Sequence, residues 1–82
     1  MPLQLHSLKR EFPQYEAQMS ALLKADGRFT RQAEEYERLD KQIFAVEDGR
    51  EAMDDSALHS LKMHRVSLKD ELLQTLEKQA QA

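Results

Sequence analysis

The sequence predicts an all-α fold: an antiparallel helical hairpin, similar to a coiled coil, with an N-terminal helical segment before it. One third of the 82 residues are charged, 40% are hydrophobic, and the chain contains only two glycines and two prolines. This composition is typical of long helices. Two segments carry apolar residues at helical spacing, and one glycine-containing loop separates them, so they can fold back on each other.

The first half of the chain predicts two helical segments within one small domain, residues 1–82. An N-terminal helical segment is expected over 4–25, with an interruption at Pro13. Proline suits the first position of a helix and disfavours helical geometry in the residue before it. Asp26 can cap the next helix, which we expect over 28–47.

The stretch EDGREAMDDS is the clear loop of the second half. Gly49 suits the left-handed backbone conformation that ends a helix. Asp54 or Asp55 can accept hydrogen bonds from the first free amides of the following helix. We expect this last helix over 56–78.

The two long helices carry matching apolar seams. Phe29, Tyr36 and Ile43 recur every seven residues in the first helix, as at the core positions of a coiled coil. If the chain folds back through the loop, residues whose numbers sum to about 104 meet across the hairpin. This register places Ile43 beside Leu61 and Tyr36 beside Leu68, so that apolar positions meet apolar positions.

An arginine occupies one seam position of the last helix. Arg65 faces Leu39, next to Asp40, in the expected register. We expect its aliphatic stem to lie along the seam and its guanidinium to form a structural ion pair with Asp40. On the exposed face of the helix expected over 28–47, Glu37 and Lys41 have the four-residue spacing of a surface ion pair.

Several large apolar side chains lie outside the seam, and Leu76 is one of them. Because a two-helix hairpin of this size is only marginally stable alone, other surfaces must cover these side chains. The cover is either the N-terminal segment or a second copy of the chain. The candidate interaction residues are Phe12, Tyr15, Met19, Phe44, Met63, Val66 and Leu73.

No pattern in the sequence points to catalysis, to a cofactor or to a metal site. The chain has no cysteine, and His59 and His64 are five residues apart, whereas helical metal ligands are commonly four apart. Neither a glycine-flanked nucleophile nor a phosphate-binding loop is present. We therefore expect a protein that is not an enzyme, has no small-molecule substrate, does not cross a membrane, and works in the cytoplasm.

The motifs REFPQY, RFTRQAEEYERLDKQI and LKMHRVSLKDELLQTL, in this order and with an acidic loop before the last, resemble the YdcH family of small bacterial proteins. The resemblance spans residues 8–76. It implies a small helical hairpin with an N-terminal extension, and it implies no catalytic or binding residues, because the function of that family is unknown. The residues that carry it are the Phe12-Pro13 step, Arg28-Phe29, Leu39-Asp40 and the run from Leu68 to Leu72.

These observations favour a protein–protein interaction module that self-associates through helix faces and has itself or another protein as partner. The alternative is a nucleic-acid or ribonucleoprotein accessory that uses a basic stripe on the last helix, formed by Lys62, Arg65 and Lys69. The net charge of −3 provides no general attraction for nucleic acid, which favours the first function.

Overall fold

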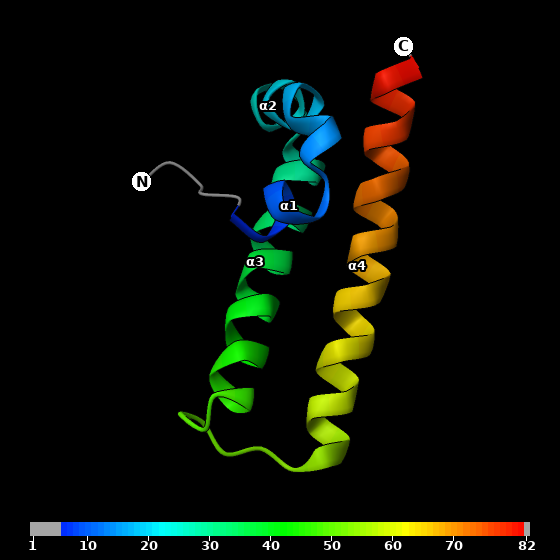
Figure 1. Cartoon of the computed structure of the whole chain (residues 1–82). Helices are drawn as coiled ribbons and strands as arrows, with labels where there is room; N and C mark the ends of the chain where they lie inside the picture. The colour runs from blue at the N-terminus through cyan, green and yellow to red at the C-terminus, as the bar shows by residue number, and fades with distance from the viewer. Residues whose placement is uncertain (1–5, 82) are drawn as a thin grey trace.

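The computed structural model describes residues 6–81, and within them the predicted all-α fold is confirmed. Residues 4 and 5 of the expected N-terminal segment lie outside this range. Figure 1 shows two long helices side by side, with the N-terminal helices packed near the beginning of the first. The elements are α1 (His6–Glu11), the 3-10 turn η1 (Pro13–Tyr15), α2 (Glu16–Ala25), α3 (Gly27–Glu47) and α4 (Asp55–Gln81).

Two aspartates define where the long helices begin. Asp26 Oδ1 accepts a hydrogen bond from the Phe29 amide at 3.1 Å, so α3 begins at Gly27, one residue before the predicted start. Asp54 Oδ1 accepts from the Ala57 amide at 2.7 Å, and α4 therefore begins at Asp55. Both contacts satisfy amides that have no partner within the first turn of a helix.

The backbone of the loop turns at Gly49, which has a φ of +81°. A side chain in this conformation is strained by about 1–2 kcal/mol. We expect Gly49→Ala to lower the free energy of unfolding by this amount, measured by urea denaturation, because no atom lies within 4 Å of an added Cβ. Gly27→Ala is the control. Gly27 is helical, and its new Cβ makes only an ordinary contact, so that variant should be neutral or slightly stabilising.

The N-terminal segment packs on its own hairpin. α1 and α2 both contact α3, and α2 also contacts α4. Leu76, expected outside the seam, is fully buried, because α2 covers this part of α4. The core residues come from every helix and are Leu8, Phe12, Met19, Leu22, Phe29, Ala33, Tyr36, Leu39, Leu68, Leu72 and Leu76.

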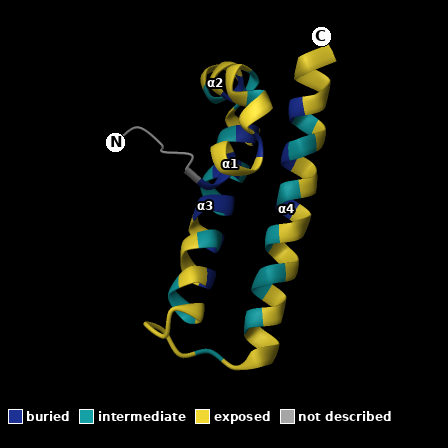
Figure 2. Cartoon of the chain, viewed as in Figure 1, coloured by how far each residue is buried: buried dark blue, intermediate teal, exposed yellow. Residues whose placement is uncertain are grey.

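The core is concentrated at one end of the hairpin. Its members on α3 lie at or before Leu39, and its members on α4 lie at or after Leu68. Residues 41–66, which include the loop, form the other end, and we call this segment the bare half. Figure 2 shows mostly exposed and half-buried residues there. Ile43 is fully buried in the bare half, whereas Leu61 is only half buried and packs against the core.

Candidate protein-interaction surface

Three large hydrophobic side chains are exposed in the described part of the chain, and all three belong to the bare half. Phe44 on α3 is 58% exposed, and Met63 and Val66 on α4 are 52% and 48% exposed. Apolar side chains gathered on one part of a small surface commonly mark a site of association. These three residues are therefore the centre of the candidate surface.

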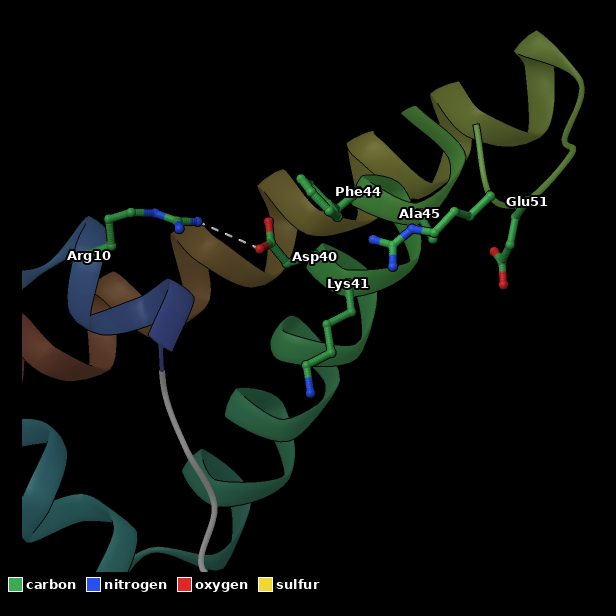
Figure 3. A pocket seen from close by; sticks show the side chains of 7 residues that line it. Arg10, Asp40, Lys41, Phe44, Ala45 and Glu51 are labelled. Atoms are coloured by element: carbon green, nitrogen blue, oxygen red, sulfur yellow. Dashed lines mark ion pairs between the residues drawn. The ribbon is translucent and has the colours of Figure 1, made fainter. Parts of the chain in front are cut away.

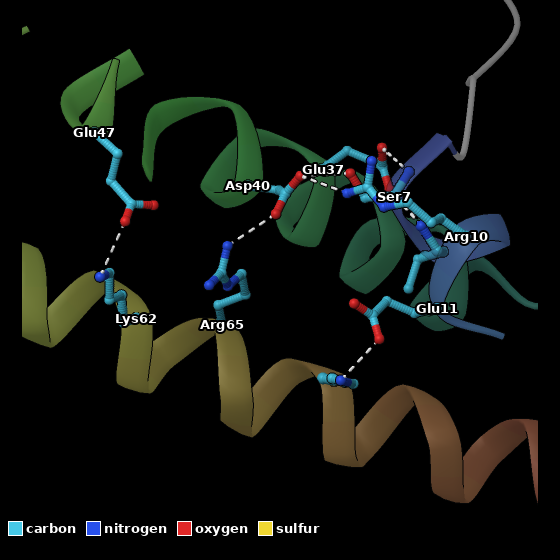
Figure 4. Close-up of polar contacts among 10 residues, drawn as sticks. Ser7, Arg10, Glu11, Glu37, Asp40, Glu47, Lys62 and Arg65 are labelled. Atoms are coloured by element: carbon cyan, nitrogen blue, oxygen red, sulfur yellow. Dashed lines mark hydrogen bonds and ion pairs between the residues drawn. The ribbon is translucent and has the colours of Figure 1, made fainter. Parts of the chain in front are cut away.

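A row of three ion pairs joins α4 to α1 and α3 along one face of the hairpin, and we call it the ion-pair row (Figure 4). The partners on α3 rise in residue number as those on α4 fall, as expected for an antiparallel hairpin. The structure thus brings together the predicted pair of Asp40 and Arg65. The row consists of Lys69 Nζ with Glu11 Oε2 at 2.9 Å, Arg65 Nη1 with Asp40 Oδ1 at 2.9 Å, and Lys62 Nζ with Glu47 Oε2 at 3.3 Å.

Asp40 also connects α1 to the hairpin. Its Oδ2 atom accepts a hydrogen bond from Ser7 Oγ at 2.6 Å and lies 3.7 Å from Arg10 Nη2. Tyr36, one helical turn earlier, is buried beside these carboxylates. Burial raises the pKa of its hydroxyl above 10.0, and the charges of Glu11 and Asp40 raise this pKa further. The phenol therefore stays neutral, and charge in this region belongs to the surrounding ionic groups.

Glu37 does not pair with Lys41, so that prediction is wrong. Glu37 is only 6% exposed. Its carboxylate turns inward and accepts hydrogen bonds from the amides of Ser7 and Leu8, both at 3.2 Å. It thereby caps α1 from a position about thirty residues away, a role that no local sequence signal indicates. Lys41 consequently has no ion-pair partner within 4.0 Å in the described part of the chain.

A shallow groove of about 610 Å³ lies beside Phe44, between the end of α1 and the loop (Figure 3). Phe44 and Ala45 provide apolar surface, whereas Arg10, Lys41 and Arg50 provide positive charge. The Arg50 guanidinium lies 5.4 Å from the centre of the Phe44 ring, which holds the arginine over the aromatic face. The groove also has acidic rim positions at Asp40 and Glu51.

The predicted interaction residues separate into three groups in the structure. Phe12 and Met19 are buried in the core, so their assignment to an interaction surface is corrected. They are covered because the N-terminal segment folds onto its own hairpin. Tyr15 and Leu73 are half buried against the core. The remaining three, Phe44, Met63 and Val66, are exposed.

The histidines do not assemble a metal site in the described residues. His64 Nε2 lies 3.2 Å from Glu35 Oε1, whereas the side chain of His6 lies outside the described part of the chain. No three histidine or carboxylate side chains among residues 7–81 come close enough together to hold a metal ion. Within 6–81, none of the helices combines the length and the apolar character needed to cross a bilayer.

A family profile described as a protein of unknown function, DUF465, matches residues 29–76. The chain belongs to this family. In this member, the DUF465 match begins at buried Phe29 of α3, includes the whole loop, and ends at buried Leu76 of α4. It therefore covers the hairpin, including the bare half, and begins after α1 and α2. No match was found among the curated proteins or among the solved structures.

Proposed function

We propose that this protein is a non-enzymatic protein–protein interaction module that self-associates through the helix faces of its bare half. The observation that carries this proposal is the exposure of Phe44, Met63 and Val66 on the end of the hairpin that α2 does not cover. Burial of these side chains by a second copy removes apolar area from water, which favours association.

The ion-pair row favours an apolar interface over phosphate binding, because it occupies the basic side chains of α4. Lys62, Arg65 and Lys69 each lie within 3.3 Å of a carboxylate oxygen on α1 or α3. Their charge is therefore largely balanced within the chain, which weakens the attraction of this stripe for phosphate. No specific observation favours the nucleic-acid function, and the interaction module is the function that we retain.

A more specific assignment is also proposed. The order and spacing of the three motifs support a YdcH-like protein, and this resemblance supports a bacterial protein that works in the cytoplasm. Fractionation of cells that express the full chain, followed by immunodetection in the cytoplasmic, membrane and periplasmic fractions, tests the proposed location. Recovery mainly outside the cytoplasmic fraction contradicts it.

Met63→Gln tests self-association, because glutamine keeps the length and helical propensity of methionine but is polar. A fully buried methionine contributes about 1.5–3 kcal/mol relative to an exposed one. We therefore expect the dissociation constant of the self-associated form to rise about tenfold or more. Sedimentation equilibrium over a concentration series, with the wild type in parallel, measures this constant.

Ala80→Gln is a suitable control, since Ala80 is exposed on α4 outside the bare half. Its dissociation constant should equal that of the wild type. A wild-type protein that remains monomeric at concentrations on the order of 1 mM contradicts the proposed self-association.

A further inference from the structure

One face of α4 carries two apolar residues and one acidic residue at the spacing of a helix that docks in a groove. Met63, Val66 and Asp70 stand at positions i, i+3 and i+7, so they share one side of the helix. All three are exposed, and no ion pair within 4.0 Å involves Asp70 in the described part of the chain. This face therefore offers two apolar contacts followed by one carboxylate.

The groove beside Phe44 is complementary to this face of α4. Phe44 and Ala45 can receive apolar side chains, and Arg50 at the loop end of the groove can receive a carboxylate. Arg50 is available for such a contact because its side chain is 63% exposed, although it also lies 3.0 Å from Asp48. The groove volume is within the usual range for binding clefts.

The thickness of the two ends determines how two copies can meet. α1 and α2 enlarge the end of the hairpin that contains the core, while the bare half consists only of α3, the loop and α4 (Figure 1). Two copies can bring their bare halves together most closely if they lie head to tail, with their enlarged ends pointing away from each other. Within one copy α4 is antiparallel to α3, so this arrangement makes α4 of the second copy parallel to α3 of the first.

The residue spacing agrees with this orientation. If Val66 of the second copy lies on Phe44, its Asp70 lies about 6 Å further along the shared direction, since an α-helix rises 1.5 Å per residue. That direction leads toward the loop, where Arg50 follows Phe44 by six residues. A two-fold axis repeats both contacts, because Phe44, Arg50 and Val66 belong to the bare half and Asp70 follows it by about one helical turn.

We infer that the partner seated in the groove is a second copy of this chain, arranged head to tail about a two-fold axis, with Val66 against Phe44 and Asp70 against Arg50. This inference rests on the proposed self-association and names the surfaces that carry it. The two bare halves together then form four packed helices.

Charge reversal at the two ends of the polar contact tests the inference. In a homodimer of Arg50→Glu, both contacts set the introduced carboxylate beside Asp70, and in a homodimer of Asp70→Lys, both set the introduced ammonium beside Arg50. Each variant alone should therefore have a dissociation constant at least about tenfold higher than that of the wild type. When the two variants are mixed, one contact of the mixed dimer joins the two introduced charges, which are opposite, and the other joins the native Arg50 and Asp70. Association should then return to within about threefold of the wild type.

Sedimentation velocity on each variant and on an equimolar mixture, with one variant fluorescently labelled, measures these constants. Arg28→Glu is the control, because Arg28 is exposed at the enlarged end and its reversal should not change association. Circular dichroism establishes that every variant is folded.

The outcomes separate this inference from the proposal on which it rests. A monomeric wild type contradicts the proposed self-association. If the wild type self-associates and both charge variants associate as tightly as the wild type, the head-to-tail arrangement alone is overturned. Two weakened variants that do not complement each other in the mixture also overturn the pairing of Arg50 with Asp70.

Discussion

Replacing Leu72 with alanine is expected to lower the free energy of unfolding by about 2–5 kcal/mol. Leu72 is fully buried on α4 where the N-terminal segment and α3 meet it. A domain of 82 residues has a total stability of roughly 4–12 kcal/mol, so this single change removes a large part of it. Urea unfolding followed by circular dichroism, at a concentration where the protein is monomeric, measures the loss.

Leu73→Ala is the matched control for this prediction. The same side chain is removed from the adjacent position of the same helix, but Leu73 is only half buried against the core. Its loss should be smaller than that of Leu72→Ala, because the transfer energy scales with the apolar area removed from water. Equal losses for the two variants contradict the described position of the core.

Glu37→Ala is expected to lower the free energy of unfolding by about 1–3 kcal/mol. The substitution removes the acceptor of two amide hydrogen bonds at the beginning of α1, from Ser7 and Leu8. The effect should be local, because Glu37 connects α1 to α3 through these two bonds. Other side chains join α4 to α1 and α3. Amide hydrogen exchange should therefore accelerate over α1 more than over α4.

Glu34→Ala provides the comparison, since Glu34 lies one turn earlier on α3 and has no ion pair within 4.0 Å in the described residues. Its effect should be within about 0.5 kcal/mol. Glu37→Gln should fall between the two, because its amide group retains one acceptor oxygen. Unchanged exchange over α1 in Glu37→Ala contradicts the capping role.

The hairpin was predictable from sequence because its causes are local or periodic. Asp26, Gly49 and Asp54 act on residues within three positions of themselves, so their caps and turn are visible in a short stretch. The seven-residue spacing of apolar positions indicates which edges of the two long helices face each other. The contact of Asp40 with Arg65 follows from the same register.

The arrangement of the N-terminal segment was not predictable, because its causes are distant in sequence. Glu37 has the spacing of a surface residue, and only the docking of α1 gives its carboxylate two amides to bind. Leu76 likewise has no role in the seam and becomes buried because α2 packs over it. The candidate surface was identified only in part for the same reason, since the packing of residues 6–25 decides which apolar side chains remain exposed.

Helices α1, α2 and α4 all contact α3, and the contact with α4 is the most extensive. Of these helices, α4 is the last to be synthesised. Until α4 has left the ribosome, the edge of α3 with Phe29, Tyr36 and Leu39 lacks its main cover. A nascent or prematurely terminated chain therefore presents a continuous apolar strip, which is the kind of surface that promotes aggregation and chaperone binding.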